Sequence, residues 1–201
     1  MTRALPGRTA HTGPEETTGG GALVVGLGGP DRGDDAVGVE VASRVAALGL
    51  PRVAVLVHED PTDLIELWSG RELVVVVDAV RSGAAAGTLV ILETGPGLGP
   101  LPHSARVRRL RGGGTHSWGV AAAVELARVL GRLPPRLTLV GIEARSFEQG
   151  APLSPEVLAA LPRAVEAVVG AVSETSAVVG VVPPGARAKP SGLKGVDHVP
   201  G

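Results

Sequence analysis

Three polar side chains lie at positions where they could bind a metal ion or transfer a proton. Asp35 follows the first apolar run of the sequence, Asp78 ends a run of four valines, and His116 precedes a helical pattern. Ligands of open α/β sheets bind beyond the carboxyl ends of the strands, so we expect these three residues to meet at one edge of a sheet. Two carboxylates and an imidazole suit Ni, Zn, Mn or Fe with open coordination positions. The residues alone therefore predict a site that contacts a metal or uses acids, with an unknown substrate.

The neighbouring acid Asp34 is expected to have a structural role. Asp34 and Asp35 both lie at the start of a predicted helix, where a carboxylate caps free N–H groups and suits the helix dipole. We assign the cap to Asp34. A second carboxylate in the same turn adds less capping, which leaves Asp35 free to serve a ligand.

The elements that must position these residues alternate between strands and helices. Predicted strands cover residues 22–27, 53–57, 73–77, 88–92 and 137–142. Predicted helices cover residues 34–48, 61–68, 117–130 and 154–172, the last with Ser154 as its N-cap ahead of Pro155. This order predicts an α/β fold: a three-layer sandwich in which a mostly parallel five-stranded sheet carries helices on both faces.

The two ends of the chain differ in composition from the middle. Residues 1–20 and 173–201 are rich in glycine, proline and polar residues and have no apolar periodicity. Such segments cannot bury enough apolar surface to offset the entropy lost on ordering, so we predict a disordered tail at each end. Residues 21–172 are then a single α/β domain.

Composition excludes several classes of function. A formal net charge of −1 gives no general attraction to nucleic acid or to an anionic membrane. The absence of cysteine excludes disulfides, thiolate zinc sites and a cysteine nucleophile. No apolar stretch approaches the roughly 18 residues of a membrane-spanning helix, and no secretory signal is visible, so we expect a cytoplasmic protein.

Sequence motifs argue against three further classes of site. Gly26 and Gly28 suggest a dinucleotide-binding turn, but Asp31 stands at the third glycine position and two acids at the helix start would repel a pyrophosphate. His58 and Glu59 do not continue into the H-E-x-x-H pattern of zinc proteases. No serine has the G-x-S-x-G setting of a hydrolase nucleophile.

Four sequence blocks, in order, resemble those of the hydrogenase maturation endopeptidases, which trim the large subunit of nickel–iron hydrogenases. The blocks are GDDAVGV at residues 33–39, DAVRSG at 78–83 followed by GT at 87–88, THSWG at 115–119, and LSPEV at 153–157. The resemblance covers roughly residues 22–172, nearly all of the predicted domain.

The resemblance implies a reaction and a role for each candidate residue. It implies a peptidase, aspartic-type or nickel-dependent, that removes the C-terminal extension of a large-subunit precursor after nickel has been loaded. The nickel would be presented by that precursor and contacted by Asp35, Asp78 and His116. Asp35 and Asp78 would also be the catalytic acids, holding or activating the attacking water.

Two features leave alternatives open. The family often has asparagine where this chain has Gly29, so a metal-sensing maturation or chaperone protein that binds the precursor without cutting it is the first alternative. Hydrolysis of an unrelated small peptide or ester is the second.

The arginine cluster between Arg106 and Arg111 is either a solvated loop or a docking surface for acidic groups of the precursor. The sequence does not indicate the oligomeric state.

Overall fold

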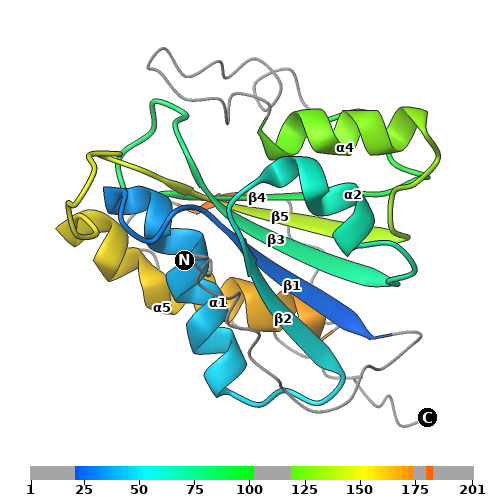
Figure 1. Ribbon diagram of the computed structural model, residues 1–201, viewed down its shortest axis with the longest axis horizontal. Helices are drawn as coiled ribbons and strands as arrows, with labels where there is room; N and C mark the ends of the chain where they lie inside the picture. The colour runs from blue at the N-terminus through cyan, green and yellow to red at the C-terminus, as the bar shows by residue number, and fades with distance from the viewer. Residues whose placement is uncertain (1–20, 102–118, 174–179, 183–201) are drawn as a thin grey trace, which may run out of the picture.

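The computed structural model describes residues 21–101, 119–173 and 180–182, which build one sheet with helices on both faces (Figure 1). The strands are β1 (Ala22–Leu27), β2 (Val53–His58), β3 (Leu73–Val80), β4 (Leu89–Thr94), β5 (Arg136–Glu143) and β6 (Gly180–Val182). The α-helices are α1 (Val37–Ala47), α2 (Leu64–Leu67), α4 (Val120–Val129) and α5 (Pro155–Val172). Two 3-10 turns, η1 (Gly33–Ala36) and η2 (Pro61–Asp63), lead into α1 and α2.

The sheet is mostly parallel, with the strand order β2-β1-β3-β5-β4-β6. β1, β2, β3 and β5 run parallel to one another, whereas β4 and β6 are antiparallel to their neighbours. The predicted α/β fold is therefore confirmed. Because the four parallel strands all end at the same edge, the segments that follow them gather there.

The structure adds a sixth strand to the five that were predicted. β6 pairs with β4 and lies inside residues 173–201, which the sequence analysis assigned to a tail. Three residues are too few to show a strand period in the sequence, and their pairing depends on an edge strand that is distant along the chain. Apart from Ser173, which follows α5, the remaining residues of both predicted tails lie outside the described residues.

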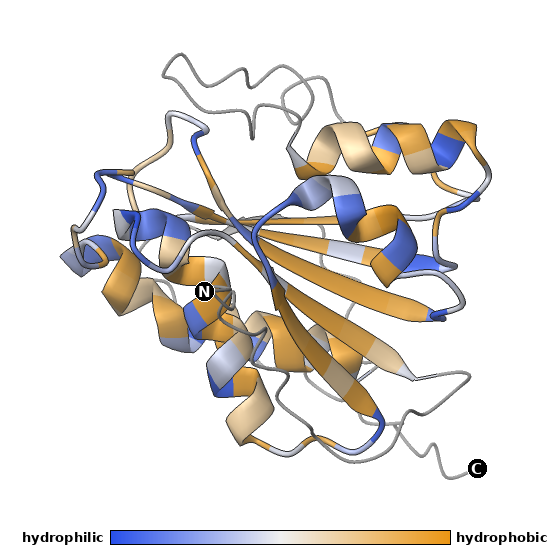
Figure 2. Cartoon of the chain, in the orientation of Figure 1, coloured by the Kyte–Doolittle hydropathy of each residue, from blue (hydrophilic) through white to orange (hydrophobic). Residues whose placement is uncertain are grey.

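Each face of the sheet carries its own apolar core, as the hydropathy colouring in Figure 2 illustrates. Val74 and Val76 pack with α2 and α4, whereas Val75 and Val77 pack with α1 and α5. Alternate residues of a strand point to opposite faces, so a central strand covered on both sides needs apolar residues at every position. The valine run before Asp78 is thus explained by burial on both faces.

Helix α1 lies unusually close to the sheet because two glycines face each other. A Cβ atom on Gly38 would come within 2.2 Å of the carbonyl oxygen of Leu27 and 2.6 Å of that of Val77. A Cβ atom on Gly26 would come within 2.2 Å of the carbonyl oxygen of Gly38. The start of α1 therefore rests directly on the ends of β1 and β3. This contact brings the η1 turn to the edge where Asp78 lies.

Within the described ranges, no helix is both long enough and apolar enough to span a membrane.

Candidate active site

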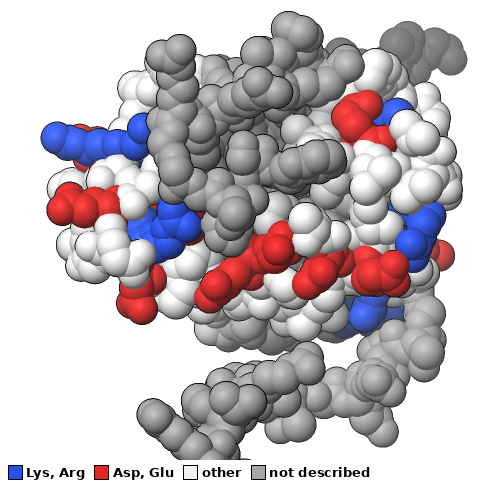
Figure 3. Space-filling model, turned by 45° about the horizontal axis from the view of Figure 1, so that its top comes forward, with Lys and Arg blue, Asp and Glu red and all other residues white. Residues whose placement is uncertain are grey.

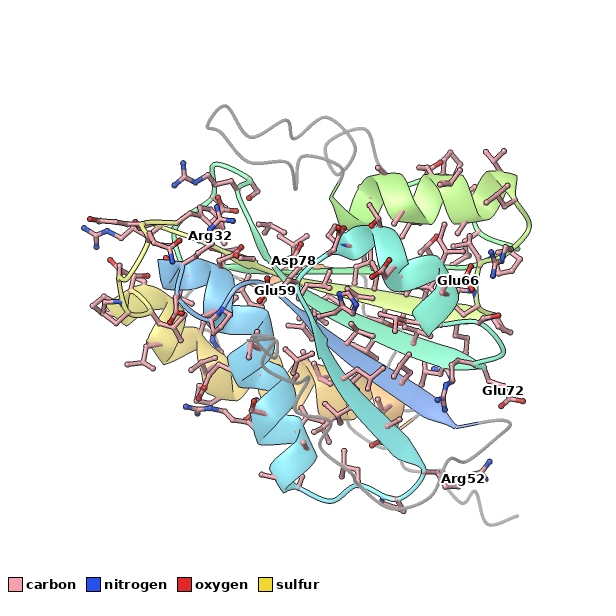
Figure 4. All side chains as sticks on the ribbon, viewed as in Figure 1. Arg32, Arg52, Glu59, Glu66, Glu72 and Asp78 are labelled. Carbon is pink, nitrogen blue, oxygen red and sulfur yellow. The ribbon has the colours of Figure 1, made fainter. Side chains whose placement is uncertain are left out.

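Asp78 lies on strand β3, and Asp35 lies in the turn that follows the neighbouring strand β1. The pairing of β1 with β3 ends at Gly26 and Val77, so Asp78 is the first residue of β3 beyond it. Asp35 lies in η1, the turn that connects the end of β1 to α1. Figure 4 shows Asp78 near the carboxyl end of β3, with Glu59 close to it in this view.

A backbone hydrogen bond orients the Asp35 carboxylate. Gly29 donates its backbone N–H to Oδ2 of Asp35 at 2.8 Å. The backbone of Gly28, with φ of 125°, passes so close to Asp35 that a Cβ atom there would lie 1.8 Å from the Asp35 carbonyl oxygen. A residue with a side chain cannot occupy that position without moving the turn. The two glycines after β1 therefore fix the place of Asp35.

The carboxyl group of Asp78 is electrostatically coupled to Asp35. Burial, first, and the negative charge of Asp35, second, raise the pKa of Asp78 from 3.8 to about 7, against a smaller lowering by the Ala79 backbone N–H. A carboxyl group with such a pKa exchanges its proton near neutral pH. Strongly shifted acids of this kind are candidates for acid–base catalysis or for binding a cation.

The third predicted residue, His116, lies outside the described residues, as does the Arg106–Arg111 cluster. In the parts of the chain that the structure describes, no three His, Cys, Asp or Glu side chains are grouped so that they could hold a metal ion. The described site thus supplies two carboxylates. Whether His116 joins them remains a prediction.

Asp34 does not cap its own helix, so that prediction was wrong. Neither η1 nor α1 has a side-chain cap. The Asp34 side chain instead turns away from the helix start, is only 1% exposed, and accepts four hydrogen bonds from the segment between β5 and α5. The capping prediction failed because these donors are more than 110 residues away along the chain and provide more hydrogen bonds than a helix start could.

Ser154 was also predicted to cap a helix and is used differently. It is the N-cap residue of α5, directly ahead of Pro155, but its hydroxyl makes no bond to the helix. Ser154 Oγ donates instead to Oδ2 of Asp34 at 3.0 Å. The helix boundary was predicted correctly and the role of the hydroxyl was not.

Glu143, which the sequence analysis missed, is a second buried acid at this edge. It ends β5, is 2% exposed, and accepts the backbone N–H groups of Ser82 at 2.6 Å and of Gly83 at 2.8 Å. It thereby holds the loop that follows β3. The sequence does carry a signal for Glu143, because this acid ends an apolar strand at the same edge of the sheet as Asp78.

A shallow hollow adjoins Asp35 on the side of β2. It has a volume of about 370 Å³ and is lined by Gly28, Pro30, Val39, Val57, His58 and Glu59. The Val57 side chain is exposed although it is apolar. Beyond the hollow, exposed acids continue along η2 and α2, among them Asp63 and Glu66. Figure 3 shows acidic side chains in a row across this part of the surface.

Comparison with known proteins gives consistent matches. A model of the hydrogenase maturation protease family matches residues 59–171. The hydrogenase 2 maturation protease of Escherichia coli (strain K12) is 30% identical over 159 residues, which is 76% of this chain and 91% of that protein. The hydrogenase maturating endopeptidase HybD from E. coli has a TM-score of 0.59 at 27% identity, covering 81% of this chain and 97% of the other. The solution structure of an endopeptidase from E. coli has a TM-score of 0.63 at 28% identity, with the same coverage.

These matches, together with the fold, define a peptidase. The chain belongs to the hydrogenase maturation protease family.

Proposed function

We propose that the chain is an endopeptidase that removes the C-terminal extension of a nickel–iron hydrogenase large-subunit precursor after nickel insertion, and that it contacts the nickel of that substrate. The observation that carries the proposal is the coupled pair Asp35 and Asp78 at the carboxyl edge of the sheet, in a chain of this family. A pair of acids at a strand edge is a site for chemistry rather than for packing, because it places two like charges together.

The acid pair suits the proton transfers of peptide hydrolysis. Cleavage of an amide requires an activated water and a proton for the leaving amine. The pKa of Asp78, about 7, allows its carboxyl group to give or take a proton at neutral pH. The Asp35 carboxylate, held by the Gly29 N–H, is placed to orient the water. Both acids are therefore assigned as catalytic residues.

The same pair would respond to a cation presented by the substrate. A divalent ion next to both carboxylates favours their ionised forms and removes the repulsion between them. His116 is the proposed third ligand. Because a precursor without nickel lacks this contact, cleavage would report that the metal has been inserted.

The hollow beside Asp35 is a suitable place for a precursor side chain near the scissile bond. Gly28 lines the hollow and also packs against Asp35, so a side chain seated there would lie close to the acid pair. The walls combine apolar surface from Val39 and Val57 with the polar groups of His58 and Glu59.

Gly29 favours one alternative function, a protein that binds the nickel-loaded precursor without cutting it. The family pattern often places an amide side chain at this position, and here only the backbone N–H is present. If that amide is needed to hold the substrate carbonyl, the chain would recognise the precursor but not cleave it.

Mass spectrometry of a purified precursor that carries its C-terminal extension tests the proposal. Incubation with the protein should shorten the nickel-loaded precursor and leave the precursor without nickel intact. An uncleaved nickel-loaded precursor in a stable complex with the protein would favour the alternative, and cleavage that does not depend on nickel would contradict the role of the metal. The precursor as partner and the cytoplasm as location are part of the same proposal.

A further inference from the structure

We propose that Asp34 is a positioning residue that acts through Asp35: by anchoring the η1 turn to the segment 144–154, it fixes the direction of the Asp35 carboxylate. The direction of the Asp35 carboxylate depends on Asp34 whatever reaction the site performs, and only the activity measurement below rests on the proposed function.

The anchor consists of four hydrogen bonds to one buried carboxylate. Oδ2 of Asp34 accepts the backbone N–H groups of Arg145 at 2.7 Å and Ser146 at 3.0 Å, together with the Ser154 hydroxyl at 3.0 Å. Oδ1 accepts the backbone N–H of Ser154 at 2.6 Å. Because the Asp34 side chain is buried, with only 1% exposure, water molecules cannot replace these donors while the segment stays in place. Asp34 therefore fixes both ends of this segment.

Backbone hydrogen bonds join the same two segments around this carboxylate. The N–H of Asp34 donates to the carbonyl oxygen of Ser146 at 2.9 Å, and that of Gly33 donates to Ala151 at 3.1 Å. Gly150 in turn donates to the carbonyl oxygen of Asp31 at 2.7 Å. The η1 turn is thus held from the side of α5 by Asp34 and its neighbours.

Asp35 is held from the opposite side by the segment after β1. Its Oδ2 accepts the Gly29 N–H, and its backbone packs against Gly28. Consecutive residues of a four-residue turn cannot move independently, so a shift at Asp34 is passed on to Asp35. A displacement of about 1 Å in a reacting group can lower a rate by about 100-fold. The Gly29 N–H reports this displacement because it is bonded directly to the Asp35 carboxylate.

A purely stabilising role for Asp34 predicts something different. Removing the carboxylate leaves buried N–H groups without acceptors and lowers stability in either case. Only the positioning role also requires the Asp35 carboxylate to leave the Gly29 N–H in a protein that is still folded. The two roles are therefore separated by a local measurement at Gly29.

The test compares Asp34→Asn with Val168→Ala by NMR. Val168 is a buried core residue of α5, about 20 Å along the helix from Ser154, and its truncation lowers stability without touching the site. Asp34→Asn should move the Gly29 amide proton upfield and increase its exchange with solvent at least about tenfold. Val168→Ala should change neither quantity.

An unchanged Gly29 amide in folded Asp34→Asn would overturn the inference. If Asp34→Asn does not fold, Ser154→Ala takes its place, since it removes one donor to Asp34 and leaves the carboxylate. It should move the Gly29 amide in the same direction by a smaller amount, and no movement there would overturn the inference equally.

Activity gives a second, separate readout. Asp34→Asn should lower kcat for precursor cleavage at least tenfold with little change in KM. When added to Asp35→Asn, it should cause no further loss, because its effect passes through Asp35. A further tenfold loss in that background would contradict the inference. If the wild-type protein cleaves nothing, the proposed function fails, while the Gly29 measurement still decides the role of Asp34.

Discussion

Asp35, in the turn that follows β1, lies near enough to Asp78 of the neighbouring strand β3 that its charge adds to burial in raising the pKa of Asp78 to about 7. Close contact between α1 and the sheet places them there, because Gly38 lets the helix start rest on Leu27 and Val77.

Removing the charge of Asp35 should lower the pKa of Asp78. In Asp35→Asn, burial still raises this pKa, but the repulsion between the carboxylates is gone, so the value should fall clearly below 7 without returning to 3.8. Carbon NMR of the Asp78 carboxyl group across pH 3 to 9 measures it. The same pKa in wild type and variant would show that the two groups are not coupled.

Replacement of Asp78 by asparagine should raise stability at neutral and alkaline pH. The folded-state pKa of Asp78, about 7, lies above its unfolded value of 3.8, so its contribution to stability is complete below pH 3.8 and is lost as pH rises towards 7. The Tm gain of Asp78→Asn over wild type should therefore be near zero at pH 3.5, grow between pH 4 and 7, and level off above. Thermal unfolding by circular dichroism measures this difference, and a gain that is constant with pH would contradict it.

Gly38→Ala should impair both stability and the site. Its Cβ atom would overlap two backbone carbonyl oxygens, forcing α1 away from β1 and β3, with an expected loss of about 1–3 kcal/mol. Gly170→Ala is the matched control, because Gly170 lies in α5 with open space around it and should gain up to about 1 kcal/mol. Urea unfolding of both variants tests the pair. Equal stability of Gly38→Ala and wild type would mean that the close helix contact is not required.

Gly29→Asn should be tolerated and should not slow cleavage. Gly29 is outside the left-handed backbone region, and a Cβ atom there would lie 3.3 Å from the flexible Arg32 side chain and 3.4 Å from Oδ2 of Asp35. We expect a stability change within about 0.5 kcal/mol and a cleavage rate equal to or above that of wild type. Cleavage by Gly29→Asn but not by wild type would establish the binding-only alternative. A tenfold slower rate would show that this site cannot use an amide.

Much of the fold could be predicted because its signals are local. The valine run before Asp78 and the glycine-rich turn before Asp35 both follow from what a buried strand and its connection need. The structure places these two acids near enough for the charge of Asp35 to affect Asp78, and the role of the site remains a prediction. The hydrogen-bond partners of Asp34, Ser154 and Glu143 could not be predicted in this way. Each bonds to a partner at least 60 residues distant, and no local pattern reveals a partner of that kind.

The most direct test of the acid pair is the cleavage rate of the nickel-loaded precursor, measured by mass spectrometry with four proteins: wild type, Asp35→Asn, Asp78→Asn and Glu72→Gln. Glu72 is an exposed acid directly before the first residue of β3, at the other end of the strand from Asp78. It is the control for loss of a carboxylate. Both aspartate variants should be slower than wild type by about 100-fold or more, with Glu72→Gln unchanged. Cleavage at the wild-type rate by folded Asp35→Asn or Asp78→Asn would contradict the account.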